Sequence, residues 1–198
     1  MIYSKIAGTG RYLPDRILTN ADLEKMVDTS DEWIRTRTGI EQRHVADEEE
    51  MTSDLCVKAA QNAMDSAGVT AEDIDMIFVG TTSPDLIFPN IATIIQHKMG
   101  ISACACYAVE AACSGFVYAL SAADKFVRTG DAKCVLVIGA EIITKLIDWD
   151  DRSTCVLFGD GAGAVVLKPS DEPGILSTHL GADGQYKQLL YYPVGVSN

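Results

Sequence analysis

Two uninterrupted apolar runs constrain the fold of this chain more than any other feature. Residues 75–82 read Asp-Met-Ile-Phe-Val-Gly-Thr-Thr, and residues 133–140 read Lys-Cys-Val-Leu-Val-Ile-Gly-Ala. Neither run alternates with polar residues, and turn-forming residues lie close by, which is typical of strands buried on both faces. Helical patterns separate the two runs. The sequence therefore predicts an α/β fold, in which a largely parallel sheet has helices on both sides.

Further segments complete this prediction. Apolar spacing and capping residues mark helices over 21–27, 31–38, 52–67, 90–99 and 114–129. Short apolar runs mark further strands over 2–13, 103–110, 162–168 and 174–180. Because the last two strands follow each other without a helix, we expect at least one antiparallel edge.

The charge balance limits the possible partners. The chain has 28 acidic and 16 basic side chains, a net charge of -12. A broadly acidic surface repels nucleic acid and anionic membranes, so we expect neither as a partner. An anionic ligand would need a local cluster of basic residues.

The six cysteines indicate the compartment. No two of them form a CxxC pair, so the sequence predicts no metal site. Most lie in apolar runs, as expected of small buried residues in a reducing compartment. The N-terminal residues lack a signal-peptide pattern, and no apolar run reaches the roughly 18 residues that a membrane helix needs. We therefore expect a cytoplasmic protein.

One cysteine has distinctive surroundings. The chain leaves the predicted strand over 103–110, passes two alanines and reaches Cys113 where the next helix begins. A helix N-terminus offers free N–H groups and the positive end of the dipole, which favour a thiolate. Small neighbours leave room for a substrate carbonyl, and the Cys113 N–H is placed to help hold an oxyanion. On these residues alone, a nucleophile and one more buried thiol are both open interpretations.

Three motifs resemble those of one family. Residues 111–116 read Ala-Ala-Cys-Ser-Gly-Phe, residues 31–40 read Asp-Glu-Trp-Ile-Arg-Thr-Arg-Thr-Gly-Ile, and residues 158–164 read Phe-Gly-Asp-Gly-Ala-Gly-Ala. In order and spacing they resemble the type III ketoacyl-acyl-carrier-protein synthases. The resemblance implies a thiolase-like fold, with residues 1–198 as the first of two similar halves around a mixed five-stranded sheet. The second half, with a catalytic His and Asn, would be absent, and the apolar end of the chain looks cut within a longer polypeptide.

The resemblance also implies an activity. Cys113 would take an acetyl group from acetyl-coenzyme A as a thioester, and malonyl-acyl-carrier protein would lose carbon dioxide and attack it. The product would be acetoacetyl-acyl-carrier protein, the start of fatty acid biosynthesis, made by a homodimer without a cofactor. Without the second half, we expect no condensation. Another thiolase-like priming acyltransferase, of polyketide or related synthesis, or a non-enzymatic fragment remain alternatives.

Further residues would bind coenzyme A. Trp33 and Arg37 lie four apart on a predicted helix and share a face, where indole and guanidinium can stack on a base. In the family the matching pair sandwiches adenine, and Thr29 and Arg152 match further contacts. Arg152, with Arg35 and Arg43, would supply the local positive charge. On the residues alone, a solvated helix face is the other interpretation.

Two phenylalanines would shape the acyl site. By resemblance, Phe88 reaches the acyl pocket from the partner subunit and favours short primers, while Phe158 lies on the wall of the substrate channel. The glycines after Phe158 lack the Lys-Ser/Thr of a phosphate loop, and a strand rather than a helix follows them. We interpret this segment as a tight turn with close backbone packing.

Overall fold

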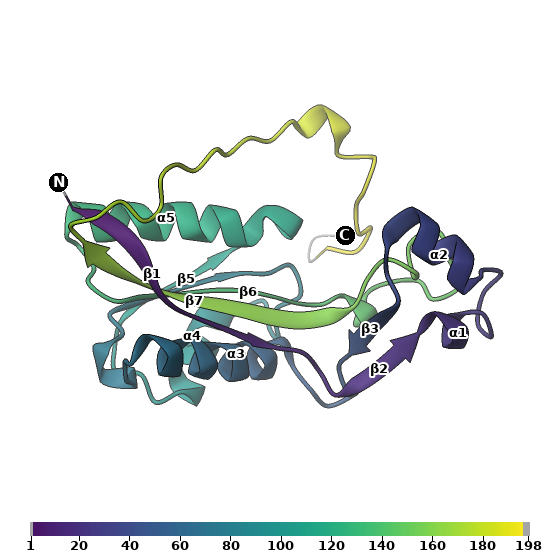
Figure 1. The fold of residues 1–198 in the computed structure, drawn as a ribbon, viewed down its shortest axis with the longest axis horizontal. Coiled ribbons are helices and arrows are strands. Elements are labelled where there is room, and N and C mark those ends of the chain that lie inside the picture. The colour runs from purple at the N-terminus through teal and green to yellow at the C-terminus, as the bar shows by residue number, and fades with distance from the viewer. Residues whose placement is uncertain (1, 196–198) are drawn as a thin grey trace.

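The computed structural model describes residues 2–195 and contains one mixed sheet (Figure 1). Five strands lie in the order β1-β7-β6-β4-β5. They span Tyr3–Tyr12 (β1), Asp160–Ser170 (β7), Val135–Ile142 (β6), Met76–Gly80 (β4) and Ala105–Val109 (β5). β6, β4 and β5 are parallel, whereas β7 pairs antiparallel with both β6 and β1. The predicted α/β fold and its mixed five-stranded sheet are confirmed.

Helices cover both faces of the sheet. α5 (Gly115–Thr129) lies on one face, and α3 (Thr52–Ala67) and α4 (Ile91–Lys98) lie on the other (Figure 1). The alternation along β6 explains its uninterrupted apolar run. Val135 and Val137 pack in the cluster with α5, while Leu136 and Ile138 pack in the cluster with α3 and α4. β6 is therefore buried on both faces, as predicted.

Most of the predicted helix ends are found. α2 (Asp31–Thr38) begins where the Ser30 side chain accepts from the Trp33 N–H, and it ends at Gly39 with φ of 76°. The first helix differs from the prediction. α1 spans only Asn20–Leu23, and its cap is Thr19. Asn20, the residue before the predicted helix and the expected cap, uses its amide to donate to the Asp31 carboxylate and to the Ile40 carbonyl, both at 2.8 Å.

Two strand predictions need correction. Residues 174–180 form no strand; Ile175 N–H donates to the Ser4 carbonyl, and Leu176 is 81% exposed. β1 occupies the side of β7 where this segment was expected to pair, and the segment instead runs along the outer edge of β1 with the bond from Ile175 to Ser4. The second is the strand over 103–110 before Cys113, for which the surrounding apolar residues suggested a buried position: it is β5 at the opposite edge of the sheet, where Tyr107 is 42% exposed.

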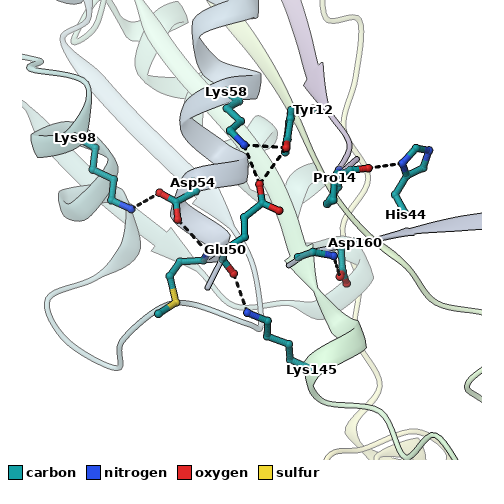
Figure 2. Close-up of polar contacts among 11 residues, drawn as sticks. Tyr12, Pro14, His44, Glu50, Asp54, Lys58, Lys98, Lys145 and Asp160 are labelled. Atoms are coloured by element: carbon teal, nitrogen blue, oxygen red, sulfur yellow. Dashed lines mark hydrogen bonds and ion pairs between the residues drawn. The ribbon is translucent and has the colours of Figure 1, made fainter. Parts of the chain in front are cut away.

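A smaller lobe, made of residues 16–45, extends from the sheet. No sequence pattern indicated its two-stranded antiparallel sheet, β2 (Arg16–Thr19) and β3 (Gln42–Val45), which lies beside α1 and α2 (Figure 1). Side chains tie the segment after β3 to the sheet domain. Figure 2 shows Lys58 between Glu50 and Tyr12, with Lys145 on the carbonyl of Glu50. Within residues 2–195, no helix has the length and apolarity to cross a membrane.

Candidate active site around Cys113

The chain turns sharply between β5 and α5. Residues Ala112–Ser114 form a single 3-10 turn, closed by the Ser114 N–H donating to the Ala111 carbonyl at 3.0 Å. Ala112 has φ of 44°, in the left-handed region that residues with a side chain rarely adopt. Cys113 is exposed in this turn, immediately before the regular helix begins at Gly115. The predicted strand-turn-helix arrangement is therefore present.

Glycines bring this turn directly onto the sheet. A Cβ atom on Gly80 of β4 would lie 2.4 Å from the Gly115 carbonyl carbon, closer than real Cβ atoms approach. A Cβ atom on Gly139 of β6 would lie 3.0 Å from the Phe116 Cβ. The first turn of α5 can rest on β4 and β6 only because both strands carry glycine there.

Cys113 lines a cavity of about 490 Å³ beyond the carboxyl ends of β4 and β6. This is the position where open α/β sheets bind ligands. The lining is mostly small: glycines and alanines of four strands, with Phe116 and Glu141 as the larger side chains. An accessible thiol beside such a cavity can attack the carbonyl carbon of a bound thioester.

Four other thiols differ from Cys113 in their surroundings. Burial raises the pKa of Cys104 to about 12 and that of Cys134 to about 11. Burial also raises the pKa values of Cys56 and Cys155, which are both fully buried. These four stay protonated near neutral pH, so they are poor nucleophiles.

We expect iodoacetamide near neutral pH to alkylate Cys113 first. Each unit by which a pKa is raised lowers the thiolate fraction about tenfold, so the four thiols with raised pKa values should react at least about tenfold more slowly. Peptide mapping over time measures the order. The fast phase should vanish in Cys113→Ser and persist in Cys106→Ser, the matched change at another partly exposed thiol. Earlier labelling of Cys56 or Cys134 would contradict this order.

Three of the predicted coenzyme A residues, Trp33, Arg37 and Arg152, are in contact with one another through the Trp33 ring. The Arg37 guanidinium carbon lies 4.6 Å from the Trp33 ring centroid, and that of Arg152 lies 4.9 Å from it. Both cations are in direct contact with the indole. A base could lie between Trp33 and Arg37 only after one side chain moved. The Thr29 hydroxyl oxygen is buried without a hydrogen-bond partner among the described residues.

Arg43 does not belong to this cluster. It is 5% exposed, and its guanidinium donates to the Asn20 side chain at 2.9 Å and to the Val156 carbonyl at 2.9 Å. Arg43 of β3 therefore joins Asn20 of α1 to Val156. Arg35 is paired with Glu41 at 2.8 Å. Of the basic residues named from the sequence, Arg37 and Arg152 are the ones at Trp33.

The two phenylalanines do not line the cavity at Cys113. Phe88 is 82% exposed, and Phe158 is half-buried while its neighbour Gly159 reaches the cavity lining. The close packing predicted after Phe158 is confirmed, because a Cβ atom on Gly159 would lie 2.8 Å from the Arg43 Cβ. Glu141, which lines the cavity, was not among the predicted site residues. The available signal was a carboxylate directly after the buried run of β6.

Comparison with known proteins agrees with the motifs. Residues 107–184 match the family model 3-Oxoacyl-[acyl-carrier-protein (ACP)] synthase III. A protein of Xanthomonas campestris pv. campestris, named beta-ketoacyl-[acyl-carrier-protein] synthase III, is 64% identical over 196 residues, which is 99% of this chain and 60% of that protein. The chain thus spans about 60% of the length of the curated relatives it matches.

Solved structures show the same fold. The 3-oxoacyl-[acyl-carrier-protein] synthase III of Aquifex aeolicus VF5 is 51% identical, with a TM-score of 0.83 over 85% of this chain and 55% of that one. The corresponding enzyme of Pseudomonas aeruginosa PAO1 is 38% identical, with a TM-score of 0.91 over 99% of this chain and 62% of that one. The sheet and its helices thus have the thiolase-like arrangement predicted above. Over nearly its whole length, the chain is similar to beta-ketoacyl-[acyl-carrier-protein] synthases III.

Proposed function

We propose that this chain is the nucleophile-bearing part of an acyltransferase that starts fatty acid biosynthesis. The whole protein would condense acetyl-coenzyme A with malonyl-acyl-carrier protein to acetoacetyl-acyl-carrier protein. One observation carries the proposal: the exposed Cys113, at the turn before α5, lines a cavity at the carboxyl ends of β4 and β6. The similarity to this family supports the same reaction class.

The first stage is acyl transfer to Cys113. The thiolate sulfur attacks the carbonyl carbon of acetyl-coenzyme A, and N–H groups at the helix start stabilise the oxyanion. The bond from that carbon to the coenzyme A sulfur then breaks. Coenzyme A leaves as a thiolate and takes up a proton, and Cys113 keeps the acetyl group as a thioester.

The second stage is carbon–carbon bond formation. Malonyl-acyl-carrier protein loses carbon dioxide, and the electron pair released attacks the Cys113 thioester carbonyl, which frees the cysteine thiolate. The enolate formed needs hydrogen-bond donors. None of the three histidines of this chain lines the cavity at Cys113. The proposal therefore places the His and Asn donors in a second half beyond residues 1–198, and the reaction uses no cofactor besides the coenzyme A thioester.

The remaining assignments belong to the same proposal. Trp33 and Arg37 would hold the adenine of coenzyme A, with Arg152 and Thr29 as further contacts. Two observations support a homodimer in which Phe88 reaches the partner's acyl pocket: β5 is an open edge, and Phe88 is 82% exposed. Phe158 would come to line the channel once the second half is in place. Six free thiols support a cytoplasmic setting.

Acetylation of Cys113 tests the proposed function. We expect intact mass spectrometry to find a single acetyl adduct after incubation of the full reading frame that contains this chain with acetyl-coenzyme A. Cys113→Ala should lose the adduct, and Cys106→Ala should keep it. An adduct that survives Cys113→Ala, or none on the full reading frame, would overturn the mechanism. Branched and longer acyl-coenzyme A substrates distinguish a priming enzyme of another pathway.

A further inference from the structure

The buried carboxylate of Asp160 joins three segments that lie far apart in the sequence. Asp160 begins β7 and is 4% exposed. Its carboxylate accepts from the Ala46 N–H at 2.7 Å, from the Thr144 N–H at 3.0 Å and from the Thr144 hydroxyl at 2.5 Å. Ala46 directly follows β3, and Thr144 lies in the 3-10 turn after β6. Asp160 and these two residues, here called the joint, hold the end of the smaller lobe against the sheet.

The hydrogen bonds at the joint balance a buried charge. No Lys or Arg within residues 2–195 forms an ion pair with Asp160. Two N–H groups and one hydroxyl therefore stabilise its carboxylate, and such charge-assisted bonds are stronger than neutral ones. Removal of the charge would leave three buried donors with a weaker acceptor. The contact is thus suited to keeping the joined segments at fixed positions.

Close packing beside the joint brings β3 onto the cavity wall. A Cβ atom on Gly159 would lie 2.8 Å from the Arg43 Cβ of β3, closer than real Cβ atoms approach. Gly159 and Gly161, on either side of Asp160, both line the cavity that Cys113 lines. The smaller lobe therefore meets the cavity through the residues around Asp160, so a change at the joint moves the lobe relative to the cavity wall.

The two ends of a coenzyme A thioester would lie on opposite sides of the joint. The smaller lobe carries Trp33 and Arg37, which are proposed above to hold the adenine, and the cavity carries Cys113, which is proposed to take the acetyl group. Adenine and thioester are at opposite ends of coenzyme A. Both can be held in reactive positions only if the smaller lobe and the cavity keep a fixed separation.

We propose that Asp160 is a positioning residue that sets the separation between the adenine site of the smaller lobe and Cys113, so that binding of the nucleotide contributes to acyl transfer. The proposal rests on the function proposed above. Asp160 acts here through Ala46 and through the glycines beside it, without touching the substrate. Its loss should weaken the contribution of the nucleotide and leave the reaction of a thioester without a nucleotide almost unchanged.

Asp160→Asn in the full reading frame tests this proposal with two substrates. Acetyl-coenzyme A contains the nucleotide, whereas acetyl-pantetheine lacks it. We expect the second-order rate constant of Cys113 acylation to fall about tenfold for acetyl-coenzyme A and to change by less than about twofold for acetyl-pantetheine. Asp73→Asn is the matched control, because this exposed carboxylate also accepts from a backbone N–H and a threonine hydroxyl. It should alter neither rate constant.

Thr144→Val provides a second variant if Asp160→Asn fails to fold. It removes one of the three donors and should lower the acetyl-coenzyme A rate constant selectively, by less. An equal fall for both substrates, or no fall for acetyl-coenzyme A, in the folded variants would overturn the positioning role. Absence of acylation in the unsubstituted protein would count against the proposed function. Calorimetry with coenzyme A would then still test Asp160, because an affinity that is unchanged in Asp160→Asn would overturn its positioning role.

Discussion

Gly80→Ala should lower the free energy of unfolding of this chain by about 3 kcal/mol, at the upper end of the usual cost of overpacking. The added Cβ would lie 2.4 Å from the Gly115 carbonyl carbon and 2.7 Å from the Phe116 nitrogen. Both are backbone atoms, so no side-chain rotation relieves the overlap. The first turn of α5 must move away from β4, and Cys113 moves with it.

Gly163→Ala is the matched control for this substitution. Gly163 also lies in a strand of the sheet, but its added Cβ would meet no atom within 4 Å. Its unfolding free energy should stay within about 1 kcal/mol of that of the unsubstituted chain. Urea denaturation measures both values, and iodoacetamide labelling reports whether Cys113 keeps its fast reaction. Equal stability of the two variants would show that α5 does not depend on the contact with Gly80.

Asp124→Ala should cost about 2–3 kcal/mol, because it leaves a buried hydroxyl without its charged partner. Asp124 of α5 is 1% exposed, and Ser4 of β1, fully buried, donates to its carboxylate. Lys125 and Arg128 also lie beside the carboxylate, at 2.7 and 3.7 Å. The contact with Ser4 joins α5 to the edge strand β1, whereas Lys125 and Arg128 belong to α5 itself. Asp131→Ala, an exposed carboxylate near the end of α5, is the control.

The cost of Asp124→Ala should depend on pH. Burial opposes ionisation of Asp124, but the hydrogen bonds from Lys125 and Ser4 outweigh it and lower the pKa below the usual 3.8. A lowered pKa stabilises the folded state above the unfolded pKa, and this contribution is lost as the pH falls through the folded pKa. The stability difference between the unsubstituted chain and Asp124→Ala should therefore be constant around neutral pH and shrink below 3.8. A difference that grows in acid would contradict this.

Local signals predicted the centre of the fold and the turn that carries Cys113. The runs over 75–82 and 133–140 indicated β4 and β6 because burial on both faces leaves no polar alternation. Gly39 and Gly130 indicated helix ends because each has the positive φ that glycine tolerates. The turn at Cys113 was predicted because its small neighbours and the following helix lie close in sequence. Each of these features depends on residues near one another in the chain.

The wrong or missing predictions depend on contacts far apart in sequence. Residues 174–180 have the composition of a strand, but β1 already pairs with the free side of β7. In the sequence, Arg43 resembles a surface cation. In the structure, its guanidinium donates to carbonyl and amide oxygens of other segments. Glu141 accepts from the Thr82 N–H only because β4 and β6 are paired, and this pairing cannot be read from the residues near Glu141 in sequence. No local pattern specifies which strands become neighbours.

The pairing of β1 with β7 has a consequence for synthesis on the ribosome. Tyr3 pairs with Ser170, so the first strand made waits for nearly the whole chain before its partner exists. At the usual speed of translation this delay is on the order of ten seconds. Throughout it, the N–H and C=O groups of β1 have no native strand to bind and can template pairing with other nascent chains. Production of this protein should therefore depend on chaperones that shield the emerging N-terminus.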